Sequence, residues 1–339
     1  MSKKVSSDEI FKFIKPDGND KLSEMKGFDL QDLLLYLDDY YLELREELGL
    51  GEDATFGLEL EFEYAMNERI EDLLWNSGLY GTWTKKIDVS LWRGAEICSP
   101  VLKDNNNSWE DVKKICLMIQ PNAKIGENAG GHVHIGTQVL GAEPSSWMNL
   151  TALWSAYENI IFRFSYNNFL TFRGGMNKYA APVAKQMRTD YESLKRMSNF
   201  EAVDVLHMIC YGKFNAINFN HVSNPFGFDN RNTIEFRCPN GTLDPVIWQN
   251  NVNFFTKFLE YAKSKNFDED MVNSRWSKVA NKFTELNWYD EIYLPQALEL
   301  CDLIFDNNLD KIYFLRQYLK SFDISEKRYD KAKAFTKKY

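Results

Sequence analysis

Apolar and polar residues alternate strictly along residues 55–64, which read Thr-Phe-Gly-Leu-Glu-Leu-Glu-Phe-Glu-Tyr. A period of two predicts a β-strand with one apolar face and, here, one face of carboxylates. Shorter patterns of this kind predict strands over residues 79–90, 93–98, 131–137, 213–221 and 233–239. Because these strands do not alternate regularly with helices, we predict an α+β fold, a mostly antiparallel sheet of about six strands with helices on one face.

Apolar residues spaced three and four apart predict helices around the strands. The predicted helical ranges are 108–120, 145–164, 190–197, 201–211 and 244–262. Helical spacing also runs from Asp29, which is placed to cap a helix, to Gly49, which is placed to end it. Residues 173–182 are rich in glycine and aromatic residues, which predicts a loop.

These patterns divide the chain into three parts. Residues 1–50 are expected to form a helical N-terminal extension, and residues 51–265 a domain that contains the sheet. Residues 266–339 show only helical patterning, so we expect a helical C-terminal segment packed on that domain.

Composition narrows the class of protein. The 339 residues are 44% hydrophobic and 26% charged, which excludes wholesale disorder and a small disulfide scaffold. A net charge of −9 disfavours a nucleic-acid binder, and the apolar runs are too short to span a membrane. The five cysteines show no CxxC spacing, and the N-terminus has no apolar signal core. We expect a cytoplasmic protein with free thiols, with no nucleic-acid or membrane partner and with its oligomeric state left open.

Candidate chemistry begins on the most regular strand. Glu59, Glu61 and Glu63 are two residues apart, so their side chains leave the same face. Three like charges at this spacing repel one another unless a cation or water neutralises them. His132 and His134 share a face in the same way, which is a pattern seen in metal and phosphate sites. A solvated edge strand and structural histidines are the alternative interpretations.

Further charged residues lie on the other predicted strands. Glu235 and Arg237 are two residues apart, as in a catalytic pair or a plain salt bridge. Asp88 and Glu96 flank a predicted hairpin. Carboxylates on four strand segments with one imidazole suit Mg²⁺ or Mn²⁺. Five or six carboxylates exceed the needs of one ion and suggest at least two, as in sites of phosphoryl transfer.

Four motifs in a fixed order carry a resemblance to a known family. They are Phe-Gly-Leu-Glu-Leu-Glu-Phe at 56–62, Asp88 with Glu-Ile-Cys-Ser-Pro at 96–100, Gly-Gly-His-Val-His at 130–134, and Thr-Ile-Glu-Phe-Arg-Cys-Pro-Asn-Gly-Thr-Leu-Asp-Pro at 233–245. Together they resemble the amidoligases, a family of ATP-dependent carboxylate–amine ligases related to glutamine synthetase and glutamate–cysteine ligase. The resemblance spans residues 55–262 and implies that residues 51–265 are a glutamine synthetase-like catalytic domain.

The resemblance implies a role for each matching residue. It assigns Glu59, His132 and Glu235 to a nucleotide-side metal ion, and it assigns Glu61, Asp88 and Glu96 to a substrate-side one. It makes Arg237 and His134 catalytic, with Arg237 steadying the transferred phosphoryl group and His134 near phosphate or substrate. Glu63 has no counterpart and is interpreted as structural. The candidates for ATP binding are Arg173, Lys178, Lys213 and Arg231, with Arg163 as a further basic residue.

The implied activity is ATP-dependent formation of an amide or isopeptide bond through an acyl phosphate, with ATP and two or more Mg²⁺ or Mn²⁺ ions. The substrates would be a carboxylate, for which the γ-carboxyl of glutamate is one candidate, and an amine. Alternatives are a metal-dependent hydrolase that uses His132, His134 and a glutamate, a guanido kinase-like phosphotransferase, and a non-catalytic relative.

Overall fold

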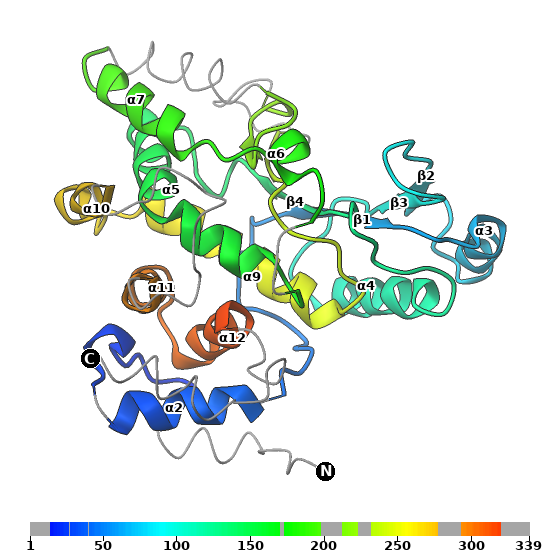
Figure 1. Ribbon diagram of the computed structural model, residues 1–339, viewed down its shortest axis with the longest axis horizontal. Helices are drawn as coiled ribbons and strands as arrows, with labels where there is room; N and C mark the ends of the chain where they lie inside the picture. The colour runs from blue at the N-terminus through cyan, green and yellow to red at the C-terminus, as the bar shows by residue number, and fades with distance from the viewer. Residues whose placement is uncertain are drawn as a thin grey trace. The chain divides into compact units, whose positions relative to one another are not determined.

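The six predicted strands are present in a computed structural model of the chain and form one antiparallel sheet (Figure 1). Their order across the sheet is β2-β3-β1-β4-β6-β5. Their bounds are β1 Phe56–Phe62, β2 Thr84–Lys86, β3 Ala95–Cys98, β4 Gly131–Gly136, β5 Ile217–Asn218 and β6 Thr233–Phe236. The predicted α+β class with a six-stranded antiparallel sheet is confirmed.

The structure describes residues 14–26, 28–39, 41–169, 173–197, 212–222, 232–276 and 293–319. The predicted helix at 201–211 and Arg231 lie outside these residues. Contacts divide the chain into two compact units, each described by itself below. One unit comprises Leu44–Glu158 and Ser165–Val279, and the other comprises Met1–Glu43, Asn159–Phe164 and Ala280–Tyr339.

The unit that contains the sheet buries one sheet face under α4 Asn106–Ile119, α9 Pro245–Lys263 and the part of α5 Pro144–Ser165 that belongs to this unit. Phe56 of β1 stacks on Trp109 of α4. Phe236 of β6 stacks on Trp154 of α5 and on Phe255 of α9. Alternation along each strand therefore places apolar residues against the helices and leaves the other face to polar side chains.

The other described helices of this unit are shorter. They are α3 Asn67–Asn76, α6 Met176–Tyr179, α7 Ala184–Leu194 and α10 Glu269–Trp276. The sequence pattern does not predict α3, and two others differ from prediction. The segment predicted as a loop at 173–182 contains the single turn α6, and α7 begins at Ala184, ahead of the predicted start at residue 190.

The other unit joins segments from both ends of the sequence. It contains the 3₁₀ turn η1 Leu22–Glu24 and the helices α2 Phe28–Asp39, α11 Tyr293–Ile304 and α12 Asn308–Leu319. The Asp302 carboxylate of α11 accepts the backbone N–H groups of Leu22 and Ser23 at 3.0 and 2.8 Å. Hydrogen bonds between a side chain and the backbone therefore hold the start and the end of the described chain together.

The helix predicted to run from Asp29 to residue 48 is wrong in its second half, because α2 ends at Asp39. Beyond it, the backbone N–H of Arg45 donates to Gln249 Oε1 at 2.9 Å, and that of Leu48 donates to the Asp104 carboxylate. These side chains replace the carbonyl groups that a helix would supply. Within the described residues, no helix combines the length and apolar character needed to cross a bilayer.

Candidate functional site

The register of the sheet brings the predicted acids and histidines onto its exposed face. Glu59 lies opposite His132 on the neighbouring strand, and His134 lies opposite Glu235. Glu61 lies opposite Glu96 on the other side of β1. Paired residues on adjacent antiparallel strands face the same side, so all these side chains project away from the helices.

A first trio consists of Glu59, His132 and Glu235, whose potential ligand atoms all lie within 4.8 Å of one another. His132 Nδ1 is 2.7 Å from Glu59 Oε2 and 3.7 Å from Glu235 Oε1. His132 and Glu235 are buried. This trio contains the three residues that the family resemblance assigns to the nucleotide-side ion.

A second trio consists of Glu61, Asp88 and Glu96, again with ligand atoms within 4.8 Å of one another. Glu61 and Glu96 project from β1 and β3, and Asp88 comes from the loop between β2 and β3. The Glu61 carboxylate accepts the backbone N–H of Gly130, and its Oε1 lies 3.4 Å from His132 Nε2. His132 therefore stands between the two trios.

Burial and hydrogen bonding shift the pKa values of the two acids of the first trio in opposite directions. Burial alone raises the pKa of Glu59, but hydrogen bonds and the charges of His132 and His134 outweigh it and hold that pKa well below its ordinary value. Burial likewise raises the pKa of Glu235. The hydrogen bond with His221 and the charges of His134, His132 and Arg237 outweigh burial, so this pKa is also lowered. Both groups are carboxylates at neutral pH, the form that binds cations.

His134 and Arg237, the two residues predicted as catalytic, border the first trio. His134 Nε2 lies 3.3 Å from Glu59 Oε1. Arg237 is buried just after β6, where its Nη1 pairs with the Glu235 carboxylate and its Nε donates to the Tyr179 carbonyl at 3.1 Å. Arg237 and Glu235 thus form a salt bridge.

Sequence reasoning missed two residues that contact Glu235. His221 Nε2 lies 3.5 Å from Glu235 Oε2, and its ring stands edge-on to that of His134 with centroids 5.4 Å apart. Asn218 Nδ2 donates to the same Oε2 at 2.9 Å. Both belong to the predicted strand 213–221, of which only Ile217–Asn218 pairs in the sheet. Residues 218 and 221 are three positions apart, which in a strand would place them on opposite faces, so strand periodicity gave no signal for the pair.

The predicted ATP-binding residues are placed very differently. Lys213 is exposed and lines the cleft with Glu61 and Arg237. Lys178 is exposed over the ring of Tyr179, 4.8 Å from its centroid. Arg163 belongs to the unit of the chain ends, where its guanidinium donates to backbone carbonyls at the end of α12. Arg163 is therefore a structural residue.

Arg173 is buried beside the strand end that carries Arg237. Its guanidinium donates to the carbonyls of Pro239 and Arg237 at 2.8 and 3.0 Å. A Cβ on Gly130 would lie 1.7 Å from Arg173 Nη1. The glycine at 130 is thus required by a side chain of the protein itself, and Arg173 fixes the backbone that follows β6.

Two adjoining cavities, of about 390 and 150 Å³, form a cleft along the polar face. The residues that line both cavities are Glu61, Asp88, His132, Lys213 and Arg237. Acids, an imidazole and two cations thus surround one space, which suits a polyphosphate with divalent ions.

Glu63, the acid that directly follows β1, has a structural environment. Its buried carboxylate accepts the backbone N–H of Trp92 at 2.7 Å and both the backbone and side-chain N–H groups of Asn128 at 3.3 Å. A Cβ on Gly126 would lie 1.6 Å from Glu63 Oε2. Glu63 therefore joins the loop that follows Asp88 to the loop that precedes β4.

The geometry can be compared with known families. A family model described as "Putative amidoligase enzyme" matches residues 5–259. The chain belongs to the amidoligase family. No curated protein matches it. The amidoligase match begins 50 residues before the stretch that carries the sequence resemblance, so it also covers most of the predicted N-terminal extension.

Amidoligase membership implies use of ATP. ATP is handled by enzymes as a complex with divalent cations, and the two trios fit such ions. The Nε2 atoms of His132 and His134 are buried and lie 3.4 and 3.3 Å from carboxylate oxygens of Glu61 and Glu59, so both nitrogens are placed to share a cation with these acids. Metal binding itself stays a prediction.

Proposed function

We propose that the protein is an ATP-dependent carboxylate–amine ligase that forms an amide or isopeptide bond through an acyl phosphate. The observation that supports it best is the pair of trios on one sheet face, Glu59/His132/Glu235 and Glu61/Asp88/Glu96, with Arg237 beside the first. Such an arrangement suits a phosphoryl group that moves from a nucleotide on one side to a carboxylate on the other.

The proposed reaction has two steps. A carboxylate oxygen attacks the γ-phosphorus of ATP, the bond to the β-phosphate oxygen breaks, and ADP leaves. The amine nitrogen then attacks the acyl carbon, the bond to the phosphate oxygen breaks, and phosphate leaves while the nitrogen loses a proton to a base. Phosphorylation is needed because a free carboxylate would have to expel oxide.

The residues have distinct tasks in this proposal. Divalent ions held by the trios would neutralise the charge that keeps a carboxylate away from ATP. The planar guanidinium of Arg237 would hold two oxygens of the phosphoryl group in transfer. A carboxylate near the second trio would attract the cationic amine and accept its proton.

A metal-dependent hydrolase is the second candidate, and one observation favours it. His134, His221 and Glu235 have ligand atoms within 4.8 Å of one another, and two histidines with one glutamate are a common zinc set. His132 and His134, the pair expected in that alternative from the sequence, do not fall in one group among the described residues. A hydrolase would need zinc and no ATP.

The test is a screen of carboxylate and amine pairs with ATP, read by mass spectrometry for amide product, ADP and phosphate. We expect turnover only with Mg²⁺ or Mn²⁺ and with both substrates present. Hydrolysis of an amide with zinc and without ATP would contradict the ligase and support the hydrolase.

Single substitutions in the trios test whether their acids are needed for turnover and for metal binding. Glu59→Gln, Glu61→Gln and Glu235→Gln should each lower the rate by about a hundredfold or more, because each removes an anionic ligand worth several kcal/mol in the transition state. Each should also weaken binding of Mn²⁺ alone, measured by calorimetry. Glu143→Gln, at an exposed acid that lines none of these cavities, is the matched control. Near wild-type rates in all three variants would rule out the two-metal site.

A further inference from the structure

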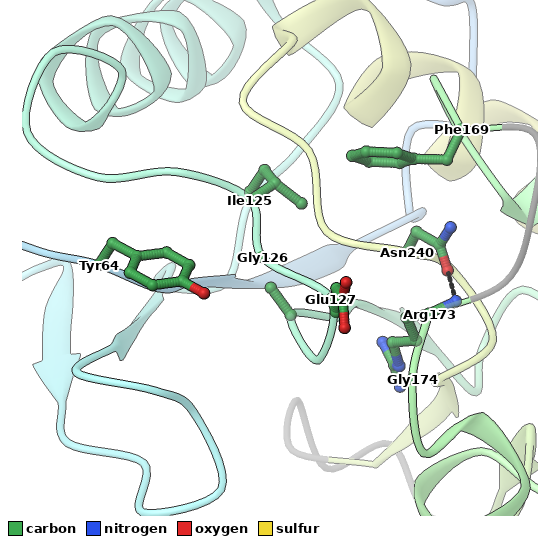
Figure 2. Close-up of a pocket in the computed structure, with 9 residues that line it drawn as sticks. Tyr64, Ile125, Gly126, Glu127, Phe169, Arg173, Gly174 and Asn240 are labelled. Carbon is green, nitrogen blue, oxygen red and sulfur yellow. Dashed lines mark hydrogen bonds between the residues drawn. The ribbon is translucent and has the colours of Figure 1, made fainter.

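A separate cavity of about 400 Å³ adjoins the cleft and shares Arg173 with it (Figure 2). Tyr64, Ile125, Glu127 and Phe169 form its outer part, and Arg173 and Asn240 form its inner end. It belongs to the unit that contains the sheet. The outer residues of this cavity have no role in the ligase reaction proposed above.

The outer part combines aromatic surface with a single acid. Tyr64 and Phe169 are 57% and 40% exposed, so their rings are accessible to a molecule in the cavity. Glu127 is exposed between them, and its carboxylate has no hydrogen-bond or ion-pair partner in the described part of the chain. Figure 2 shows the Tyr64 hydroxyl, the Glu127 carboxylate and the Phe169 ring arranged around the opening.

The position of Tyr64 is imposed by the surrounding backbone. Its φ of 54° lies in the left-handed region, which an aromatic residue rarely adopts. The backbone on both sides is pinned, since Tyr64 N–H donates to the Trp92 carbonyl at 3.0 Å and Ala65 N–H donates to the Arg93 carbonyl at 2.9 Å. The fold thus holds an exposed tyrosine at the wall of this cavity in an unfavourable conformation.

The inner end connects the cavity to the second trio. Arg173 bonds to two carbonyls through its guanidinium and to Asn240 Oδ1 through its backbone N–H, the bond drawn in Figure 2. The loop of residues 125–129 lines one wall, and the next residue, Gly130, donates its N–H to Glu61. A molecule in the cavity would therefore sit one loop away from the acids assigned to the substrate side.

We infer that this cavity binds the amine substrate, as an alkylammonium with at least one apolar arm. The ammonium group would meet Glu127 and the aromatic faces, which attract a cation, and the alkyl arm would cover Ile125. An anion is disfavoured, because Arg173 is the one basic residue among the described lining residues and its guanidinium is buried against carbonyls. This inference rests on the proposed ligase function, and it excludes ammonia as the preferred amine.

Three five-carbon probes test the charge that the cavity selects: pentylamine, pentan-1-ol and pentanoate. Binding to the full chain, without ATP or metal, is measured by saturation-transfer NMR and calorimetry. We expect pentylamine to bind roughly fivefold or more tightly than the other two, from its contacts with one exposed carboxylate and two rings. Glu127→Gln should remove that preference, and Tyr64→Leu should weaken pentylamine binding, whereas Glu143→Gln should leave it unchanged.

The outcomes separate this inference from the ligase proposal. Absence of pentylamine binding, tighter binding of pentanoate, or a preference for pentylamine that survives Glu127→Gln would each overturn the amine site. If ATP-dependent amide formation is then still observed, the ligase proposal stands alone. If pentylamine binds through Glu127 but no amine supports amide formation with ATP, the cavity is an alkylammonium site and the ligase proposal is wrong.

Discussion

Arg237 shows how one side chain joins the sheet to its candidate chemistry. It follows Glu235 by two residues, so both leave the same face, and the two groups pair directly. Its Nε is fixed by the Tyr179 carbonyl, which leaves the guanidinium directed into the cleft. Arg237 thus forms the salt bridge expected of a structural residue, and its guanidinium also lies in the cleft, as a catalytic role requires.

Substitution Arg237→Lys separates these two roles. A lysine keeps the charge near Glu235 but cannot span two phosphoryl oxygens with a planar fork. We expect kcat to fall about tenfold or more while the affinity for ATP changes little, because the charge on the phosphoryl group is largest in the transition state. Steady-state kinetics and a thermal melt measure both effects.

The control is Arg188→Lys, at an arginine that pairs with Glu192 on α7 and lines none of the cavities described here. It should leave kcat unchanged. A large fall in Tm of Arg237→Lys with kcat intact would assign Arg237 to the structure alone.

At the scale of single residues, much of the grouping of side chains in the candidate site could be predicted from the sequence. Period-two spacing places Glu59 and Glu61 on one face, and the strand register then carries His132 and Glu235 to the same place. His221 escaped prediction because it follows a strand of two paired residues, too short for any periodicity. The contacts of Glu63 with two loops depend on tertiary structure and leave no local pattern.

Among the elements, α7 has an unusual beginning. Its N-cap residue, Val183, has no side chain able to cap it, and the buried Glu158 of α5 accepts the backbone N–H groups of Val183 and Ala184 at 2.7 and 3.0 Å. Trp154 Nε1 donates to the same oxygen at 2.8 Å. One helix thus caps another across the fold.

This cap makes stability depend on pH. Burial raises the pKa of Glu158 to about 7 from an ordinary 4.5, although its three hydrogen bonds oppose the shift. Between these values the folded chain keeps a proton that the unfolded chain loses. The free energy of unfolding therefore falls as pH rises from 4.5 to 7, by about 3 kcal/mol in total from this group.

Urea unfolding at pH 5 and pH 8 measures that dependence. Glu158→Gln keeps an oxygen to accept the three N–H groups but cannot ionise. The free energy of unfolding of this variant should therefore change less between pH 5 and pH 8 than that of the unsubstituted chain, whereas Glu143→Gln should show the full change. An equal change in Glu158→Gln and the unsubstituted chain would mean that the pKa of Glu158 is not raised.

Helix ends were harder to predict than the sheet. The strict alternation over the seven residues of β1 fits only a strand, whereas residues 41–48 continue the helical spacing of α2 but do not form a helix. The deciding interactions come from Asp104 and Gln249, which lie more than fifty residues away in sequence. No local pattern contains them.

At the scale of the whole molecule, a buried ion pair lies between the segments from the two ends of the described chain. The Lys311 side chain is fully buried and lies 2.8 Å from the Asp302 carboxylate, which is 6% exposed. Its Nζ also donates to Asn19 Oδ1 and to the Asp20 carbonyl at 2.7 and 2.6 Å. A single ammonium group thus joins residues that are about 290 positions apart.

Lys311→Met should open this unit. The substitution leaves Asp302 buried without its cation, and breaking such a pair costs about 3 kcal/mol or more. Amide hydrogen exchange over residues 14–26 and 293–319 should therefore quicken by roughly a hundredfold. Peptides from β1 and β4, which belong to the other unit, serve as the internal reference.

The matched control is Lys113→Met on α4, where the lysine is 43% exposed and pairs with Glu110 one turn away. A surface pair of this kind contributes only about 0.5 kcal/mol, so exchange should change by less than about threefold. Equal exchange in Lys311→Met and the unsubstituted chain would show that the chain ends are joined by their apolar contacts alone. A hundredfold change confined to residues 14–26 and 293–319 would instead show that a buried charge holds them, because no apolar contact is removed by placing methionine at this position.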